Sequence, residues 1–554
     1  MKTKTFVSPI RQIVLPILIV LAVAFVGFYV MLPALNPLDP TFWAWLFMTA
    51  VIGVGAYLLL NGKEAIKNLQ IKFENGRLNW QDFFTKDLSA WSKKAKTIAL
   101  SILAVILVCI LVLFISSARM TNADEYQGLL QVTESDFAED IAEIPISQIP
   151  IVDRDTAERL GSRKIGEVVE LVSQFNVSSN YTQINYQGKP YRVSPLQYAG
   201  ILKWLANRNE GVPYYVAIDM ATQKTDLVEL AEGMKYSPTE LFARDLTRHV
   251  RFAYPTLLLN EESFEIDESG HPYWVVSYFT YSIGILGGKD VQGVILVDAV
   301  TGEMEKYAVG DVPAWIDRVY SADMVLSQAN DWGTLSNGYF NSILAQKNCV
   351  VTTDGYNYIA VDDDVWLYTG ITSVAADESN IGFILVNMRT KEAKTYYING
   401  AEEYSAMSSA EGKIQEKGYN ATFPILINVH DRPSYFISLK DNAGLVKAYA
   451  FVSVADYQLV GVADTIEGAK AEYLRILGVD VTPAPDTDVT THTGKIAAIA
   501  TAVVNGNSVY YIRLENGEIY TATIAVSARL PFLAVGDSIT FLADKNGVIR
   551  SIED

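Results

Sequence analysis

The stretch "GVILVDAVTGEMEKYAV", residues 293–309, recurs in related form as "GFILVNMRTKEAKTYYI" at 382–398 and "YYVAIDMATQKTDLVEL" at 214–230. Each copy has an apolar run, then Asp or Asn, then Thr three places later, then a second run that alternates apolar and polar residues. Alternating runs on both sides of turn residues predict paired antiparallel strands. The stretch therefore predicts a repeated strand–turn–strand.

The Asp and Thr positions are candidates for either a site or a turn. Asp298 corresponds to Asn387 in one copy, which keeps a side-chain acceptor and loses the charge. Asp and Asn both accept a hydrogen bond from the backbone N–H two residues on, whereas acid catalysis or strong calcium binding needs the carboxylate. Gly302 corresponds to Lys391 and Gln223, so no glycine is expected to be required. The pattern favours a turn that marks modules.

A complete unit surrounds the first copy, over residues 237–312. "SPTELFARDLTRHVRFAYPT" predicts a helix in which Ser237 and Glu240 form a capping box and Pro238 is the first helical residue. "LLLNEESFEIDESGHPYWVVSYFTY" then predicts two strands joined at "DESGHP". The expected order is helix, strand, hairpin, strand.

This order resembles the PepSY family of small extracytoplasmic domains. The resemblance is best at 237–309 and weaker at 155–230 and 408–465. In the range 408–465 the turn has lost its Thr. It implies a helix packed on an antiparallel sheet, and a partner among secreted or membrane peptidases that the modules would restrain. The residues that carry it are Tyr273, Trp274, Val297, Asp298, Ala299, Thr301, Gly302 and Glu303.

The rest of the chain divides by composition. Residues 313–400 read as one or two amphipathic helices, with Trp315 and Val325 available for packing, followed by β-hairpins. The last sixty residues alternate strongly around Asn-Gly turns and resemble an OB-fold barrel. The expected class is α+β, with a connector at 118–154, α+β modules at 155–236, 237–312 and 401–478, a linker at 479–494 and a small barrel at 495–554.

The N-terminal region, residues 1–117, contains three runs without ionisable residues, at about 13–35, 42–60 and 97–117. Each is about long enough to cross a hydrocarbon core of roughly 30 Å, which predicts three membrane spans. Lys and Arg in the N-terminal tail and in the loop 61–96 predict that both are cytoplasmic. Residues 118–554 would then lie outside a bacterial cell, with the lipid bilayer as one partner.

Charge and cysteine content restrict the partners further. The formal net charge is −19, and the acidic residues are concentrated after residue 117. Such a surface repels phosphate backbones, so no nucleic-acid partner is expected. Cys109 lies in the third apolar run and Cys349 is alone beyond it, so the outer part has no internal disulfide.

The sequence contains few of the motifs that mark known catalytic sites. No HExxH, CxxC or GxSxG sequence is present, and we expect neither a cofactor nor a metal ion. His249 lies one helical turn after Asp245, which favours a surface Asp–His contact over a metal pair. Cys349 begins an apolar run and is expected to be a buried thiol, and "VDDDVW" at 361–366 is expected to be a charged turn.

Tyrosine, used 31 times, is the notable surplus. It buries its ring and keeps its hydroxyl hydrated, which suits recognition of peptides or glycans. We predict a non-enzymatic binding or scaffold component of a cell-envelope assembly, with envelope proteins or peptides as partners and the oligomeric state open. The alternatives are a peptidase regulator and a wall-glycan hydrolase that uses two carboxylates. The candidate binding residues are Tyr273, Trp274, Tyr278, Tyr281, Tyr356 and Tyr358.

Overall fold

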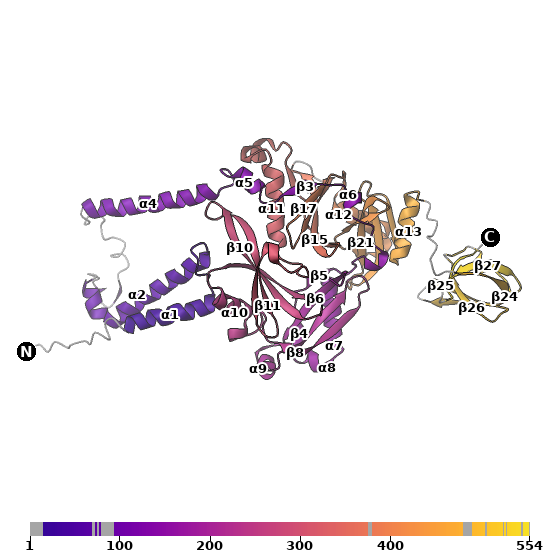
Figure 1. Ribbon diagram of the computed structural model, residues 1–554, viewed down its shortest axis with the longest axis horizontal. Helices are drawn as coiled ribbons and strands as arrows, with labels where there is room; N and C mark the ends of the chain where they lie inside the picture. Colours follow the sequence, from indigo (N-terminus) through magenta and orange to yellow (C-terminus); the bar gives the residue numbers. More distant parts are fainter. Residues whose placement is uncertain are drawn as a thin grey trace, which may run out of the picture. The chain divides into compact units, whose positions relative to one another are not determined.

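The computed structural model (Figure 1) divides into two compact units, Met1–Tyr473 and Leu474–Asp554, which are treated separately below. The structure describes the chain in the following segments. They are residues 15–68, 73–74, 77–78, 93–374, 379–479, 490–504, 507–524, 526–527, 529–544 and 547–552.

Three helices come first: α1 (Leu15–Met31), α2 (Pro40–Asn68) and α4 (Lys93–Ser117). The helices α1 and α2 run side by side (Figure 1), and the Trp45 Nε1 donates to the Ala24 carbonyl at 2.9 Å. The C-terminal end of α4 meets the tip of a long hairpin, where Ile285 and Leu286 N–H donate to Ser117 Oγ at 3.1 and 2.9 Å. Large apolar side chains on all three helices are exposed.

The predicted membrane spans at 13–35, 42–60 and 97–117 are wrong. Among the residues that the structure describes, no helix combines the length and the apolar character needed to cross a membrane. The first helix, α1, has 17 residues, which at 1.5 Å per residue gives about 26 Å against a core of roughly 30 Å. The same finding overturns the predicted three-helix anchor, the predicted multi-pass localisation and the predicted placement of residues 118–554 outside a cell. Most of the predicted cytoplasmic loop 61–96 lies outside the described residues.

After α4, a connector leads into the modules. It contributes one strand, β3, which pairs in parallel with β17 of a later sheet through Val132, Thr133 and Glu134. Its elements are α5 (Ala123–Gln127), β3 (Val132–Glu134), α6 (Phe137–Asp140) and a 3₁₀ turn at Ile146–Gln148.

Four modules with one common plan follow (Figure 1). In each, a helix precedes a first strand that pairs with the second, the second pairs with the third and the third with the fourth, all antiparallel. In three of the modules the first strand is split into two pieces. The first module contains α7 (Arg154–Gly166), α8 (Val169–Val172), β4 (Phe175–Val177), β5 (Thr182–Tyr186), β6 (Lys189–Tyr198), α9 (Ile201–Asn207), β7 (Val212–Asp219) and β8 (Thr225–Met234).

The second module has the longest hairpin and an unbroken first strand. Its elements are a 3₁₀ turn at Phe242–Arg244, α10 (Leu246–Ala253), β9 (Leu258–Ile266), β10 (Pro272–Ile283), β11 (Gly287–Asp298) and β12 (Met304–Ala308).

The third module lies within 313–400, where the sequence predicts helices and hairpins but no repeat of the plan. Its elements are α11 (Ala322–Leu335), a π-helical turn at Asn341–Ala345, β13 (Val350–Thr352), β14 (Asn357–Val361), β15 (Asp364–Ser373), β16 (Ser379–Asn387), β17 (Ala393–Tyr396) and the added strand β18 (Gly400–Ala401).

The fourth module closes the series. Its elements are α12 (Glu403–Lys413), a 3₁₀ turn at Gln415–Lys417, β19 (Asn420–Ala421), β20 (Ile425–Val429), β21 (Arg432–Lys440), β22 (Val446–Ser453) and β23 (Val460–Ala463), followed by α13 (Ile466–Ile476).

The turn between the third and fourth strands is built as the sequence predicts. Asp298 Oδ1 accepts from the N–H groups of Val300 and Thr301 at 2.7 and 2.9 Å. Asn387 Oδ1 accepts from the N–H groups two and three residues on at 2.9 Å each, and Asp219 does the same. The interpretation as a turn cap is therefore confirmed in all three copies.

The turn itself does not require glycine, as predicted, because Lys391 and Gln223 occupy the position in two copies, but Gly302 is restricted by its surroundings. The backbone at the fourth turn position is left-handed in every copy, with φ of +79° at Gly302, +65° at Lys391 and +61° at Gln223. Glycine adopts this conformation without steric cost, whereas Lys and Gln adopt it with strain. At Gly302 a Cβ atom would also lie 2.3 Å from the ring of Tyr236.

A second backbone feature, which we call the module closure, repeats in all four modules. The residue after the turn cap donates its N–H to the start of the second strand of its module, and its carbonyl accepts an N–H from the segment before the module's helix. Each module thereby joins its own beginning to its own end. The N–H groups that donate to the second strand, each given with its acceptor, are Met220 to Pro190, Ala299 to Pro272, Met388 to Val365 and Val454 to Pro433. In the same order, the carbonyls of these four donors accept from the N–H groups of Ile151, of Lys235 and Tyr236, of Val319 and Tyr320, and of Ala401.

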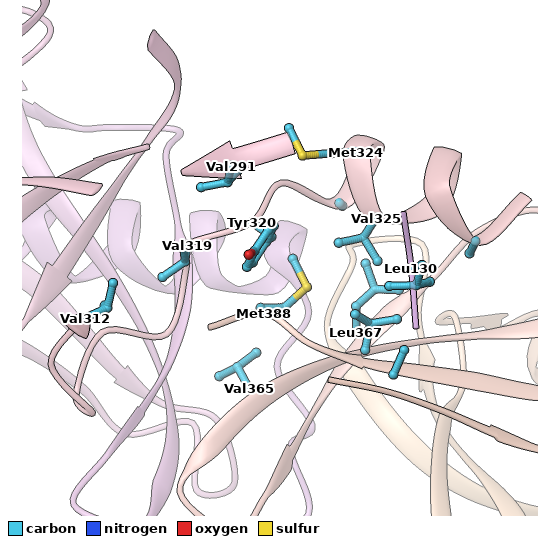
Figure 2. Close-up of a cluster of buried hydrophobic side chains, with 14 of the residues drawn as sticks. Leu130, Val291, Val312, Val319, Tyr320, Met324, Val325, Val365, Leu367 and Met388 are labelled. Atoms are coloured by element: carbon cyan, nitrogen blue, oxygen red, sulfur yellow. The ribbon is translucent and has the colours of Figure 1, made fainter. Parts of the chain in front are cut away.

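The second and third modules share one hydrophobic core (Figure 2). Val291 of β11 faces Val319 and Tyr320 of the connecting segment, and Met388 of the third module lies between that segment and its own sheet. All of these side chains are buried. Burial of apolar area contributes about 25 cal/mol per Å², so a shared core holds the two modules together as one body.

Two sequence-predicted helices differ from the structure. The Ser237–Glu240 capping box does not form, because α10 begins only at Leu246 and is capped by Asp245, whose Oδ1 accepts from Arg248 N–H at 2.8 Å. Glu240 is buried instead and accepts a hydrogen bond from Trp204 Nε1 at 2.6 Å. Residues 313–321 are not α-helical, so the predicted amphipathic helix is confirmed only from Ala322 onward.

The C-terminal unit forms a five-stranded antiparallel sheet in the order β26-β25-β24-β27-β28. Its described core includes Ile512, Phe541 and Ile549. The resemblance to an OB-fold stays a prediction, and residues 480–489 of the predicted linker lie outside the described part of the chain. The strands are β24 (Thr490–Val504), β25 (Asn507–Leu514), β26 (Ile519–Thr523), β27 (Ser538–Ala543) and β28 (Ile549–Ile552).

Candidate functional site

A polar cavity of about 600 Å³ opens where the four modules meet. Its walls come from the start of α7, the β4–β5 segment, β9, the start of α11, β14 and the loop before β20. A site whose lining depends on every module is a stronger candidate than one on a single module, because only the packed assembly creates it.

The floor of the cavity carries Arg318. Its Nη2 donates to Tyr358 Oη at 2.6 Å, and its Cζ lies 4.1 Å from the centre of the Tyr358 ring. Burial lowers the pKa of Arg318, but Tyr358 and the carboxyl of Glu265 raise it by more, so the pKa lies above its usual value. The guanidinium is therefore a permanent, partly desolvated positive charge.

Arg192 of β6 is a second guanidinium in the lining, and only 8% of the residue is exposed. Its Nε donates to the Val152 carbonyl at 3.1 Å and its Nη2 to Gln183 Oε1 at 3.3 Å. Burial lowers the pKa of Arg192 to about 10, and the nearby charge of Arg318 acts in the same direction. Within the described part of the chain, neither arginine forms an ion pair.

Carboxylates occupy the rim. Glu261 of β9 and Asp323 of α11 are exposed at the mouth of the cavity, with Asp155 of α7 on the same lining. Glu262 is half-buried, and burial raises its pKa above the usual value. Arg154 at the start of α7 is also exposed in this lining, so the mouth carries both charges.

A pair of buried carboxyls lies behind the floor and joins three modules. Glu265 accepts from Asp317 N–H at 2.8 Å and from Ser263 Oγ at 2.7 Å, while Asp317 Oδ2 accepts from Asn185 N–H at 2.7 Å. Burial raises the pKa of Glu265, and burial together with Glu265 raises the pKa of Asp317 well above its usual value. This pair holds the segment that presents Arg318, so it positions the floor.

The tyrosines and the tryptophan predicted as a binding surface are divided by the structure. Tyr356 and Tyr358 lie in the cavity lining, with ring centres 5.6 Å apart. Trp274 is buried, and its Nε1 donates to the Tyr236 carbonyl at 2.9 Å. Tyr278 is also buried.

The other predicted aromatics lie elsewhere on the second module. Tyr273 packs on Trp315 with ring centres 5.2 Å apart. Tyr281 lines a neighbouring hollow of about 420 Å³ that also includes Glu261 and Asp323. The two arginines of the floor were missed by sequence reasoning, and no local signal marks them.

The remaining candidates are in structural positions. His249 Nε2 contacts the Gly302 carbonyl at 2.7 Å and not the Asp245 carboxylate. Cys349 is buried as predicted, with its Sγ 3.3 Å from the Thr334 carbonyl. In "VDDDVW", Asp364 pairs with Arg389 at 2.7 Å. Among the described residues, no cluster of three His, Cys, Asp or Glu side chains is suited to a metal ion.

Comparisons with known proteins add little. No family model matches the sequence, and no curated protein matches it either. A mutant levansucrase of B. megaterium is 9% identical over 76% of this chain and 97% of its own, with a TM-score of 0.18. An exo-1,5-alpha-L-arabinanase from a bovine ruminal metagenomic library is 11% identical over 69% of this chain and 98% of its own, with a TM-score of 0.16. Likenesses at this level carry no argument, so the resemblance to PepSY domains stays a prediction.

Proposed function

We propose that this chain is a non-enzymatic binding protein whose four modules together form one ligand pocket. The observation that carries the proposal is the cavity at the module junction, because all four modules contribute to its lining. The shared core between the second and third modules supports a fixed pocket in place of separate modules on flexible connections.

The chemistry of the floor supports binding of a ligand with an anionic group. Taking a charge out of water costs several kcal/mol unless a partner offsets the loss, and Arg318 has donors beyond its one bond to Tyr358. A carboxylate or phosphate accepts from such donors in paired geometry. An anionic ligand would complete the hydrogen bonding of the floor.

The proposal is tested by thermal unfolding of the full chain with four separate additives: free-acid hexapeptides of mixed sequence, cell-wall glycan fragments, succinate and inorganic phosphate. At least one additive should raise the unfolding temperature of the wild type. The rise should be lost in Arg318→Met and kept in Arg163→Met, since Arg163 is exposed on α7 and away from the cavity. An unchanged unfolding temperature with every additive would contradict the proposal.

One observation favours a second candidate, a hydrolase that uses two carboxylates. Burial raises the pKa of Glu262, which lies in the same lining as Glu261 and Asp323, and a raised carboxyl pKa is the direction that a general acid needs. In that case Glu262→Gln would abolish turnover of a glycan substrate and leave its binding intact. If wild type releases no reducing ends from wall glycans, this candidate is excluded. Restraint of a peptidase, implied by the PepSY resemblance, stays a prediction.

A further inference from the structure

The floor of the cavity holds two guanidiniums whose hydrogen bonds all go to neutral groups. Arg192 donates to the Val152 carbonyl and the Gln183 amide oxygen, and Arg318 donates to the Tyr358 hydroxyl. Both arginines line the cavity, and they are close enough that the charge of Arg318 lowers the pKa of Arg192. Two like charges in one cavity disfavour each other, so an anion bound at the floor offsets a cost that the protein alone leaves in place.

Away from the floor, the lining offers hydrogen-bonding groups of both kinds. Glu261 and Asp323 are exposed carboxylates, which accept, and Arg154 is an exposed guanidinium, which donates. Side chains that can both donate and accept belong to the same lining: Asn180, Thr182, Ser263 and Ser321. A sugar hydroxyl also donates and accepts, so it matches all of these groups, whereas an ammonium group only donates and meets a like charge at Arg154.

Aromatic rings add apolar faces to this polar lining. Tyr356 is 38% exposed, and its ring centre lies 5.6 Å from that of Tyr358. Phe423, from the loop before β20, also lines the cavity and is half-buried. A sugar ring has C–H groups on its faces and hydroxyl groups around its edge, so its faces suit such rings while its edge suits the polar groups. The volume of about 600 Å³ lies within the range of roughly 300–1,000 Å³ that is typical of ligand pockets.

We propose that the cavity binds an acidic saccharide, whose acid group contacts Arg318 and is also attracted by Arg192, and whose hydroxyl groups bond the mixed polar lining. The proposal rests on the proposed function and names its ligand class. The acid group is a carboxylate or a phosphate ester, because both accept hydrogen bonds from a guanidinium in paired geometry. The acid group supplies the attraction to the floor, and the hydroxylated rings supply the fit to the rest of the cavity.

The experiment measures binding to the full chain by calorimetry with four sets of probes. The first set contains di- and trisaccharides with a uronic or N-acetylmuramic acid, and the second contains the same saccharides with the carboxylates converted to amides. The third contains sugar monophosphates, and the fourth contains free-acid hexapeptides, succinate and inorganic phosphate, which lack the hydroxylated ring. The first or the third set should bind, which separates a carboxylate from a phosphate ester. The second and fourth sets should bind about 10- to 100-fold more weakly.

Variants test the two parts of the ligand separately. Arg318→Met should weaken binding of the acidic saccharide by about 10- to 100-fold, and Arg163→Met should leave it unchanged. Arg318→Lys should weaken it by about 3- to 10-fold, because an ammonium does not pair with two oxygens at once, and this variant serves if circular dichroism shows that the Met variant is not folded. Tyr356→Ala should weaken binding by about 3- to 10-fold. Tyr457→Ala is its matched control, because Tyr457 is 44% exposed and lies outside the lining.

The outcomes separate this inference from the proposed function. Equal binding of the acidic and the amidated saccharides, or equal effects of Tyr356→Ala and Tyr457→Ala, would overturn the inference. Binding of peptides, succinate or inorganic phosphate that depends on Arg318, with equal or weaker binding of every saccharide, would also overturn it and leave the proposed function intact. Absence of binding by all four sets would overturn both.

Discussion

The second and third modules have the same plan and differ in charge at the same turn. In the second, Asp298 caps the turn with one carboxylate oxygen and contacts His271 Nε2 with the other, at 3.0 Å. In the third, Asn387 makes the same cap and donates through its amide to Asp364, at 2.8 Å. Both turns require a side-chain oxygen that accepts hydrogen bonds from the backbone. The negative charge of Asp298 serves only the contact with His271 in the second module. The difference shows that a repeated acidic residue need not mark a repeated chemical site.

The largest expected effect concerns the residue after the cap, which is Ala299 in the second module and Met388 in the third. Both are fully buried, but only Met388 extends into the core shared by the two modules. Met388→Ala should lower the stability of the third module by about 2–5 kcal/mol through the cavity it leaves. Hydrogen exchange of the β15 and β16 amides measures the loss. A smaller effect than that of the overpacking variant Ala299→Met would contradict the shared-core account.

The next largest expected effect concerns the left-handed backbone position of the turn, which is Gly302 in the second module and Lys391 in the third. Gly302→Lys gives the second module the residue that the third has at this position, at φ +79° and against the Tyr236 ring. We expect a loss of about 1–3 kcal/mol, seen as faster exchange in β11 and β12. Gln223→Gly in the first module is the matched control, because Gln223 has the same left-handed backbone, and it should change stability by less than about 1 kcal/mol. Equal effects of the two variants would show that the ring contact is unimportant.

The smallest effect concerns the charge itself. Burial raises the pKa of Asp298, but hydrogen bonds from Thr301 and Val300 N–H and from His271 lower it by more, so the pKa is below its usual value. A depressed carboxyl pKa stabilises the fold above the unfolded pKa of about 3.9, and this contribution is lost as pH falls through the folded pKa. Asp298→Asn should cost less than about 1 kcal/mol at neutral pH and remove the acid sensitivity of β11–β12 exchange. Acid sensitivity that persists in the variant would assign it to another group.

Sequence reasoning found the local features and missed the assembled ones. The turns were predictable because Asp298, Asn387 and their Thr partners act on backbone groups two or three residues away. The last hairpin of the third module was predicted at 382–398, but the rest of the module was not recognised as a copy of the plan, because Val365 and Trp366 begin its second strand where the second module has Pro272 and Tyr273. These substitutions keep the pairing while removing the residue pattern.

The site could not be predicted for a different reason. Arg318 and Arg192 come from the connecting segment and from β6, which are far apart in the sequence and meet only through tertiary packing. The Ser237–Glu240 pair failed in the same way, since Trp204 of an inserted helix takes the Glu240 carboxylate that a capping box would use. Tertiary partners override local signals wherever a polar side chain is buried.

The module closure has a consequence for the order in which the chain acquires structure during synthesis. The segment before each helix is made first, yet its hydrogen-bond acceptor, such as the Ala299 or Met388 carbonyl, is made near the end of the module. Early residues of a module therefore have no native backbone partner until the last hairpin has left the ribosome. Synthesis should advance folding in four steps, one for each completed turn, and a chain stopped just before a cap residue should leave that module open to proteolysis.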